Sequence, residues 1–421
     1  MSGLLTKKKV NDFLVYGLGQ AINLLSPLIV IPYLISVCGE TGLGKIGVGF
    51  SIALILNSII DYGSYIIGVK EISIRRDDNE FVAEKALAIY SSKILLFGIL
   101  SLLAIVAFTT IPFLYNDKEL YILSLAIVLG QLINPAWFFQ GIENYKWLSF
   151  TNILSKAIYL LLIYLLVDKE SDYIWVNLFF GVGAIVSNTV ALAYISMQYK
   201  LSLRRINFKA GIKILKEEFR LSLSQVFLSL YQYVPIVIIS FLIGNYFAGQ
   251  YRVIDQVIAI LKSYLVIFFY FVFANICYEV NSDSKRGIKV WGIYNSLNLI
   301  FILLILVSFY FATPFILSFF KLHPDDINEV ATIFRIGLLV PLLVAISLPL
   351  RQLMFAFDEN DVYIKITIIT TVLNICLLFL LIPAYGLTGA IISVLIIEFI
   401  VIALYLLILN KHFKKAFYND R

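Results

Sequence analysis

The stretch AIISVLIIEFIVIALYLLILN, residues 390–410, contains a single charged residue, Glu398, within a mostly apolar run. A hydrocarbon layer about 30 Å thick is crossed by a helix of roughly 20 such residues. The stretch is therefore predicted to belong to a membrane-spanning helix, and similar runs recur along the chain. We predict twelve helices, at about 12–36, 46–67, 86–113, 119–140, 148–167, 173–197, 219–243, 253–276, 288–314, 330–356, 362–382 and 386–410.

The composition also predicts an all-α integral membrane protein. Of the 421 residues, 61% are hydrophobic and 14% are charged, and the mean hydropathy is +0.91. The length alone would suggest two or three soluble domains, but these values do not describe soluble cores. The first apolar run is longer than the roughly 7–15 apolar residues of a signal peptide and lacks a cleavage site. We expect it to remain as the first helix.

Basic residues are distributed unevenly between the two sets of predicted loops. With the N-terminus in the cytoplasm, cytoplasmic segments hold 22 Lys and Arg residues, whereas the opposite loops hold five: Lys45, Lys118, Lys169, Arg252 and Lys321. Basic loops resist translocation, so both termini are predicted to be cytoplasmic. The same flanks account for most of the net charge of +6 without a nucleic-acid partner.

The longest cytoplasmic connections include residues 198–218, near the middle of the chain. This segment is predicted to link two six-helix lobes, 1–205 and 206–421, arranged around a central cavity. An internal echo agrees: PLIVI at 27–31 resembles PIVII at 235–239, and each is followed by two glycines five residues apart. Parallel repeats of this kind are a common plan among transporters.

Several features that could suggest nucleotide binding, metal binding or catalysis lack the residues that these functions need. GETGLGKI, residues 39–46, resembles a phosphate loop but ends in Ile46, where Ser or Thr would bind magnesium. The two histidines, His323 and His412, lie outside the apolar runs, so no His-based metal or catalytic site is predicted within the membrane. The three cysteines show no C-x-x-C spacing. The sequence thus predicts no enzyme, no metal and no resident cofactor.

Ionisable residues inside the apolar runs are the candidate functional groups, because a charge at the centre of a bilayer costs about 2.5–3.5 kcal/mol. The deep cations are Lys93, Lys156, Lys262, Arg335 and Arg351, and the deep anions are Asp61, Asp255 and Glu398. Asn57/Asp61 and Asn152/Lys156 are i,i+4 pairs, and Asp255 and Lys262 share one helix face. Amides add polar stripes to the first helix of each lobe: Gln20 and Asn23, then Gln225 and Gln232. We predict a water-accessible cavity with a net charge of +2.

Other interpretations of these residues remain open. Lys93 and Lys365 lie within reach of a cytoplasmic interface, where lysine side chains can extend to water. An alternative role for the amide stripes is to join helix to helix by hydrogen bonds. Lys156, Lys262 and Glu398 lie near mid-depth, where extension to water explains them least.

Four stretches together resemble bacterial O-antigen and polysaccharide flippases of the multidrug/oligosaccharidyl-lipid/polysaccharide exporter superfamily. They are DYGSYIIGVKEIS (61–73), NPAWFFQGIENYKWLSFTNILSK (134–156), AGQYRVIDQVI (248–258) and LIPAYGLTGA (381–390). The resemblance covers almost the whole chain. One departure is FFYFVFANI (268–276), which lacks a proline that the family often has and so leaves the bending of that helix open.

Local physics assigns roles within NPAWFFQGIE, residues 134–143. Pro135 frees a backbone carbonyl near the cytoplasmic end of the fourth helix. Trp137 is expected at the membrane interface, and Gln140 and Glu143 are expected at the entrance of the polar cavity.

The resemblance implies a flippase that moves polyprenyl-diphosphate-linked oligosaccharide, an O-antigen or capsule repeat unit, to the outer leaflet of the bacterial inner membrane by alternating access. It implies membrane lipid and the polysaccharide assembly machinery as further partners. Coupling to H⁺ or Na⁺ would use Asp61, Asp255 or Glu398. The alternatives are a multidrug cation antiporter of the same superfamily, which would favour a negative cavity, and a polysaccharide polymerase or ligase, which would be expected to use a larger, basic external loop.

Overall fold

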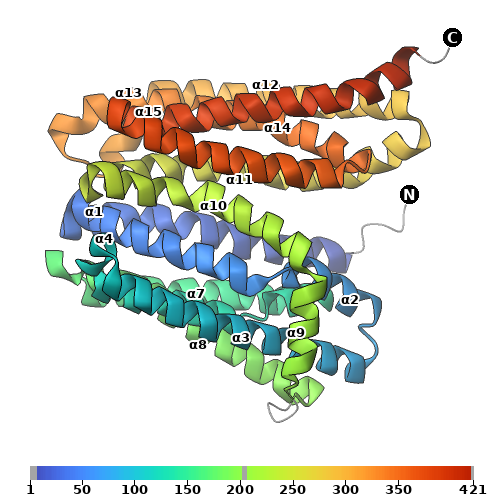
Figure 1. Ribbon diagram of the computed structural model, residues 1–421, viewed down its shortest axis with the longest axis horizontal. Helices are drawn as coiled ribbons and strands as arrows, with labels where there is room; N and C mark the ends of the chain where they lie inside the picture. Colours follow the sequence, from blue (N-terminus) through green and yellow to red (C-terminus); the bar gives the residue numbers. More distant parts are fainter. Residues whose placement is uncertain (1–6, 202–205, 419–421) are drawn as a thin grey trace. The chain divides into compact units, whose positions relative to one another are not determined.

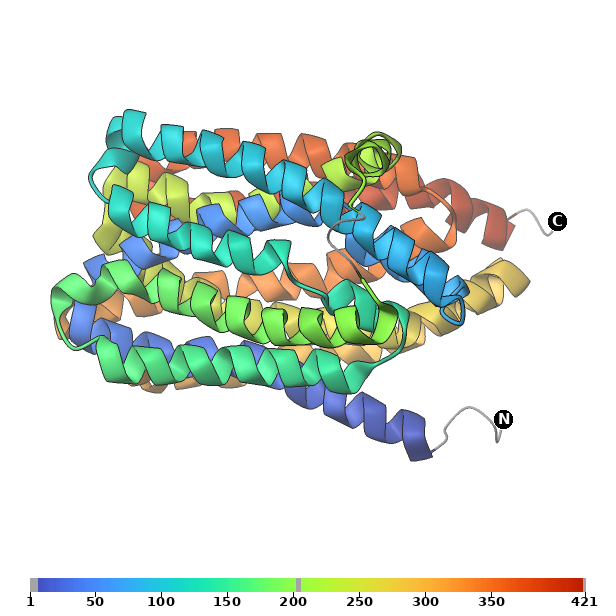
Figure 2. The ribbon, with the colours of Figure 1, turned by 90° about the horizontal axis from the view of Figure 1, so that it is seen from below.

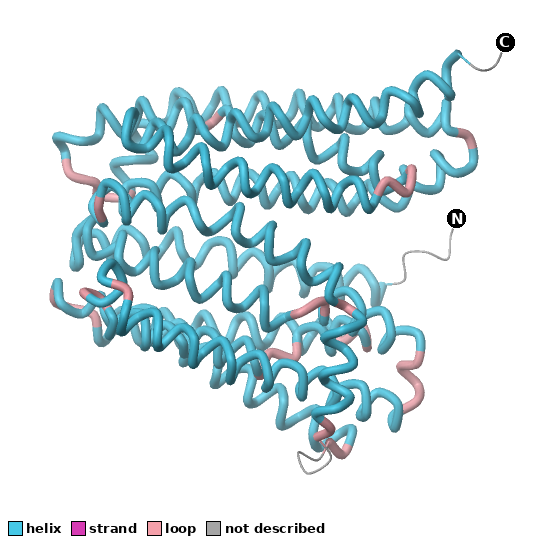
Figure 3. Tube along the Cα trace, in the orientation of Figure 1, coloured by secondary structure: helices cyan, strands magenta, loops and turns pink. Residues whose placement is uncertain are grey.

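The computed structural model describes residues 7–201 and 206–418; side chains within these ranges are described except at 7–16, 18, 20, 66, 221 and 418. Every regular element in the described ranges is a helix, as the cyan trace in Figure 3 shows. The elements are α1 (Lys7–Asp61), η1 (Ser64–Gly68), α2 (Val69–Ile74), α3 (Asn79–Thr110), α4 (Pro112–Tyr115), α5 (Lys118–Leu132), α6 (Ala136–Gly141), α7 (Tyr145–Leu166), η2 (Glu170–Asp172), α8 (Tyr173–Tyr199), α9 (Phe208–Glu217), α10 (Phe219–Ile243), α11 (Asn245–Ser282), α12 (Ser284–Phe319), η4 (Pro324–Asp326), α13 (Ile327–Gly337), α14 (Leu339–Ala356) and α15 (Asn360–Tyr418).

Membrane-spanning helices account for most of the described chain. Ten helical segments are long and apolar enough to cross a membrane. Two of them, in α1 and α15, each merge two helices across a single residue, at Gly39 (φ 67°, ψ 177°) and Gly386 (φ 58°, ψ −139°). Counting both halves of α1 and α15 gives twelve spans among the described residues, which confirms the predicted all-α fold of about twelve helices. GETGLGKI begins with the Gly39 joint and continues as helix, so it follows a helix and not a strand, and Lys45 lies within a helix and not in an external loop as expected.

The chain groups into two compact units, Met1–Val237 and Ile238–Arg421. The predicted lobes were 1–205 and 206–421; the contacts group α9 and most of α10 with the N-terminal unit. The two lobes as repeats around a central cavity stay a prediction, and each unit is described by itself below.

Within the N-terminal unit, α1, α5, α7 and α8 pack closely because small residues lie at their contacts. A Cβ added at Gly183 of α8 would lie 2.4 Å from the carbonyl oxygen of Ser155 in α7. A Cβ at Gly181 would lie 2.5 Å from the carbonyl carbon of Ala126 in α5. Glycine at these two positions therefore sets how closely α8 approaches its neighbours.

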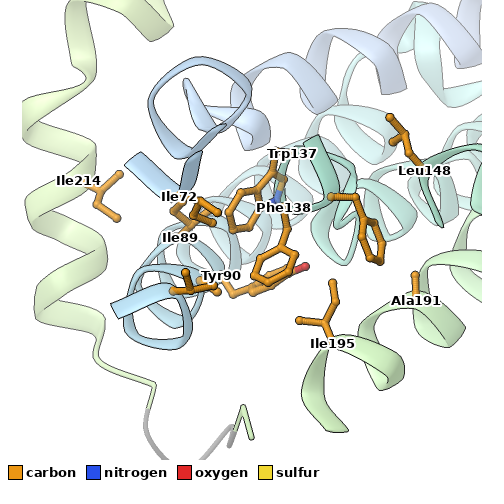
Figure 4. Close-up of a cluster of buried hydrophobic side chains, with 12 residues drawn as sticks. Ile72, Ile89, Tyr90, Trp137, Phe138, Leu148, Ala191, Ile195 and Ile214 are labelled. Carbon is orange, nitrogen blue, oxygen red and sulfur yellow. The ribbon is translucent and has the colours of Figure 1, made fainter. Parts of the chain in front are cut away.

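The stretch 134–143 folds into its own short helix, α6, after α5 has ended at Leu132. Trp137, Phe138 and Phe139 are completely buried in a cluster with Ile72 and other residues of the unit (Figure 4). The predicted placement of Trp137 at the membrane interface is therefore wrong. Because α6 packs against α2, the indole faces protein on every side and not the lipid headgroups.

The C-terminal unit packs α11, α12, α13, α14 and α15 against one another. Its largest described cluster is centred on residues such as Leu353, Tyr363, Tyr405 and Leu409. α11 is one continuous helix of 38 residues, so the stretch without proline at 268–276 carries no break. α11 also begins eight residues before the predicted start at 253, which places Arg252 within a helix and not in an external loop as expected.

Candidate functional site

A polar cavity of about 130 Å³ lies inside the N-terminal unit. Its walls come from α1, α5, α7 and α8 and from the link between α5 and α6. Amides, hydroxyls and one lysine dominate the lining, which consists of Asn23, Asn57, Ile127, Gln131, Asn134, Thr151, Asn152, Ser155, Lys156, Phe180, Ala184, Ser187 and Asn188. So many polar groups at membrane depth are costly unless protein, water or a ligand pairs with them.

Some lining amides are paired with neighbouring protein groups. The Nδ2 atom of Asn188 donates to the Gly130 carbonyl at 2.9 Å, and Nδ2 of Asn134 donates to Oε1 of Gln131 at 3.1 Å. The Oδ1 atom of Asn57, in contrast, is buried and accepts no hydrogen bond from the described protein. Buried acceptors are usually paired, so this oxygen is suited to accept a hydrogen bond from a ligand or water in the cavity.

Lys156 is the only charged residue among those that line the cavity. Its Nζ atom lies 3.7 Å from the centre of the Phe180 ring, a favourable cation–π distance. Phe50 and Tyr159 hold that ring from its sides, with ring centres at 5.0 and 5.2 Å. The amine is thus placed at the wall of the cavity by packed aromatic residues, where it supplies a positive charge when it is protonated.

A second charged group, the pair Asp61–Lys93, adjoins the cavity through Gln131. Lys93 Nζ lies 3.1 Å from Asp61 Oδ1, and Gln131 Nε2 donates to the same oxygen at 2.6 Å. Lys93 is 1% exposed, so it does not extend to the cytoplasmic interface, and that alternative is wrong. The two charges offset each other, which leaves the amine of Lys156 as the ionisable group among the lining residues.

The other predicted residues of the N-terminal unit lie outside this lining. Gln140 is partly buried in α6, and Glu143 is exposed and pairs with Arg76 at 2.8 Å. On α10, Gln225 is partly buried and Gln232 is exposed. The side chain of Gln20 falls outside the described side chains. Substrate contact by these residues stays a prediction.

Two predicted cations of the C-terminal unit rest on aromatic rings. The guanidinium of Arg335 lies 5.0 Å from the Tyr310 ring centre, and that of Arg351 lies 5.0 Å from the Phe269 ring centre. The Nε atoms of both arginines are buried without a hydrogen-bond partner among the described residues.

The predicted anions of this unit have protein partners. Asp255 forms an ion pair with Arg252 at 3.7 Å, one turn before it on α11. Glu398 is buried and accepts a hydrogen bond from Ser347 at 2.8 Å. Lys262 is partly exposed on α11. The predicted roles of these residues remain predictions.

Sequence reasoning found Asn23, Asn57, Asn152 and Lys156 by their place on apolar helices but missed other lining groups. Gln131, Asn134 and Asn188 were not predicted. A signal existed for the first two, because polar side chains three residues apart precede Pro135 inside an apolar context. No group of three potential metal ligands occurs among the residues described. The site offers hydrogen bonds and one amine that binds anions when it is protonated, which suits a hydroxyl-rich or phosphate-bearing ligand.

Comparison with known sequences gives a family and two curated relatives. Residues 10–273 match the model of the family described as polysaccharide biosynthesis protein. The chain is 25% identical over 399 residues to the "Putative O-antigen transporter" of Escherichia coli (strain K12), covering 93% of this chain and 94% of that protein. It is 22% identical over 404 residues to the protein of the same name from Shigella dysenteriae, covering 93% and 96%.

Solved structures resemble the fold over nearly the whole chain. One is the lipid II flippase MurJ in an inward closed conformation, with a TM-score of 0.69 at 15% identity, covering 94% of this chain and 87% of that one. Another is an inward-facing multidrug resistance transporter of the MATE family and MOP superfamily, with a TM-score of 0.68 at 13% identity, covering 96% and 100%. At these identities the likeness establishes the fold alone.

Proposed function

The chain belongs to the family of polysaccharide biosynthesis proteins, and from this membership we propose that it is a flippase. Its cargo would be a polyprenyl-diphosphate-linked oligosaccharide, an O-antigen or capsule repeat unit, moved from the cytoplasmic to the outer leaflet of the bacterial inner membrane. The chain is a multi-pass membrane protein, and its family is one of transporters, which confirms the expectation that it is not an enzyme.

The observation that best supports this proposal is the amide-rich cavity with the amine of Lys156 in its wall. A diphosphate carries roughly two negative charges, and an ammonium group can replace part of its lost hydration with charge-assisted hydrogen bonds. Amides that both donate and accept suit the hydroxyls and acetamido groups of sugars. The headgroup would occupy polar surface while the polyprenyl tail remains in the hydrocarbon.

Transport would proceed by alternating access, in which the two lobes rock and expose the site to each side in turn. The basic bias of 22 to five places both termini in the cytoplasm under this proposal. Any energy coupling would use H⁺ or Na⁺. Asp61 is the first candidate for this coupling, since its carboxylate accepts a hydrogen bond from Gln131, which lines the cavity.

A multidrug cation antiporter is the second candidate, because the fold is shared with a multidrug resistance transporter. The charge of the cavity disfavours it. A cationic drug would approach the ammonium of Lys156 without an anion among the lining residues to offset the repulsion.

The test is rescue of glycan export in cells that lack their own flippase, each strain producing one defined lipid-linked glycan. We expect export of at least one glycan and no change in resistance to cationic dyes. The control is the same cells carrying an unrelated multidrug pump. Dye resistance without export of any glycan, at normal protein abundance, would replace the proposal with the antiporter.

A further inference from the structure

Helix α9 crosses the membrane-spanning helices of its unit instead of running along them. Figure 1 draws it across α3, and Figure 2 shows it end-on at the outer edge of the unit. Because the spanning helices define the direction through the bilayer, a helix that lies across them lies along the membrane surface.

Contacts on one face fix α9 in this position. A Cβ added at Gly211 would lie 2.4 Å from Oγ of Ser91 in α3, and Ile214 points from α9 toward the buried cluster (Figure 4). The Ser91 hydroxyl donates to the carbonyl of Asn207 at 3.1 Å. At the other end, the Tyr62 hydroxyl donates to the carbonyl of Leu215 at 2.6 Å. α9 is therefore a docked helix with a definite outer face.

The outer face divides into an apolar stripe and a basic stripe. Phe208 and Ile212, one turn apart, are 47% and 45% exposed. At 3.6 residues per turn, an adjacent stripe of exposed lysines runs beside them along the helix: Lys209, Lys213 and Lys216. One acidic neighbour, Glu217, lies 3.8 Å from the ammonium of Lys213, but both side chains are more than 60% exposed, so this pair screens the stripe weakly.

We propose that α9 binds anionic lipid headgroups at the membrane surface. Phe208 and Ile212 enter the boundary between headgroups and acyl chains, and the three lysines contact lipid phosphates. This division of faces is that of helices that lie in the interface plane, whose apolar side enters the bilayer and whose basic side meets anionic lipid. The cytoplasmic leaflet is the anionic one, and the basic bias assigns the 198–218 segment to that side.

The occupant is the bilayer itself, for two reasons. A soluble phosphate would use the lysines but leave both apolar side chains in water, whereas a lipid surface satisfies both stripes together. The stripes also run parallel to the membrane surface, so several headgroups can contact the three lysines at once. This inference does not depend on which glycan, if any, the protein transports.

The first experiment measures immersion of the apolar stripe in the full chain. Cys38, Cys277 and Cys376 are replaced with alanine, Ile212→Cys is labelled with an environment-sensitive dye, and the protein is placed in nanodiscs. Nanodiscs of phosphatidylcholine alone are compared with nanodiscs that also contain phosphatidylglycerol. We expect a blue shift and quenching by headgroup-proximal lipid quenchers in the anionic discs. An emission that stays aqueous in both discs would overturn the proposal.

The second experiment measures the basic stripe by titrating short-chain phosphatidylglycerol and following the same dye. Each lysine near an anionic surface contributes about fivefold in affinity, so neutralising three should weaken binding on the order of 100-fold. The test variant carries Lys209→Gln, Lys213→Gln and Lys216→Gln. The matched control removes the same charge elsewhere, with Lys289→Gln, Lys414→Gln and Lys415→Gln, and should retain the affinity of the parent.

Three outcomes would contradict lipid binding by α9. The first is equal weakening by the test and control variants, because it would reflect net charge alone. The second is a parent protein that shows no preference for phosphatidylglycerol over phosphatidylcholine. The third is complete competition by inorganic diphosphate at matched ionic strength, since it would identify a site for soluble phosphates.

Discussion

Replacing Lys156 with methionine removes one ammonium group from the cavity wall while keeping a side chain of similar length. The parent ammonium lies 3.7 Å from the Phe180 ring centre, and a thioether can keep a favourable contact with that ring. An ionisable group at membrane depth costs free energy, and methionine removes that cost while filling a similar volume. Lys156→Met should therefore accumulate at least as well as the parent.

Transport should fall despite that normal abundance. A hydrogen bond to a charged group contributes about 1.5–3 kcal/mol, so its loss weakens binding of the diphosphate by about 10- to 150-fold. Lys156→Arg keeps the charge and should retain much more activity, although the planar fork changes the geometry.

The assay is flipping of a fluorescent lipid-linked diphosphate sugar in proteoliposomes, measured as a function of substrate concentration. Lys146→Met is the matched control, since Lys146 lies on the same helix but is exposed. We expect the apparent KM to rise for Lys156→Met and to stay unchanged for Lys146→Met. Parental concentration dependence for Lys156→Met, at equal protein content, would refute diphosphate binding at this lysine.

Three further predictions concern other parts of the molecule. Asp61→Asn or Lys93→Met alone should lower thermal stability by up to about 3 kcal/mol, because each leaves a partly or fully buried charge without its partner, and the double variant should recover most of the loss; additive losses would argue against the pair. Burial raises the pKa of Glu218, which precedes the apolar span of α10, to about 7. The folded state thus holds this proton more tightly than the unfolded chain, so the contribution of this carboxyl to stability is fully present below about pH 4.5 and is lost as the pH rises through about 7; Glu218→Gln should flatten the fall of Tm over this range, and an unchanged slope would exclude this carboxyl as its source. In intact cells, a single cysteine at Asn116 should react with a membrane-impermeant thiol reagent and one at Asn281 should not; the reverse labelling would invert the topology.

The number of spans was predictable because it depends on local runs of sequence. Apolar length alone separates helices: the joint at Gly39 falls between two predicted spans, and the joint at Gly386 coincides with the predicted start of the last one. The i,i+4 pair Asn152 and Lys156 was also found locally, and both residues line the cavity. Properties that follow from one helix face were therefore accessible from sequence.

Properties that depend on how distant segments meet were not accessible. Asp61 and Lys93 are 32 residues apart. Their places in two apolar runs predicted that each lies deep in the membrane, but not that the two side chains pair. Trp137 matches the composition of an interfacial belt, yet it is buried because α2, α3 and α7 surround α6. In both cases the deciding contact is tertiary and leaves no periodic signal in the sequence.

At the Gly39 and Gly386 joints, the backbone conformation decides which enantiomer of an amino acid each position accepts. A Cβ added at either position would meet no atom within 4 Å, so space does not demand glycine there. The demand comes from the sign of φ, +67° at Gly39 and +58° at Gly386, which L residues rarely adopt. The mirror image of the Gly39 conformation is ordinary extended backbone. D-alanine introduced at residue 39 by chemical ligation should therefore preserve the joint that L-alanine strains, so this turn between two membrane helices selects against one enantiomer and not against a side chain.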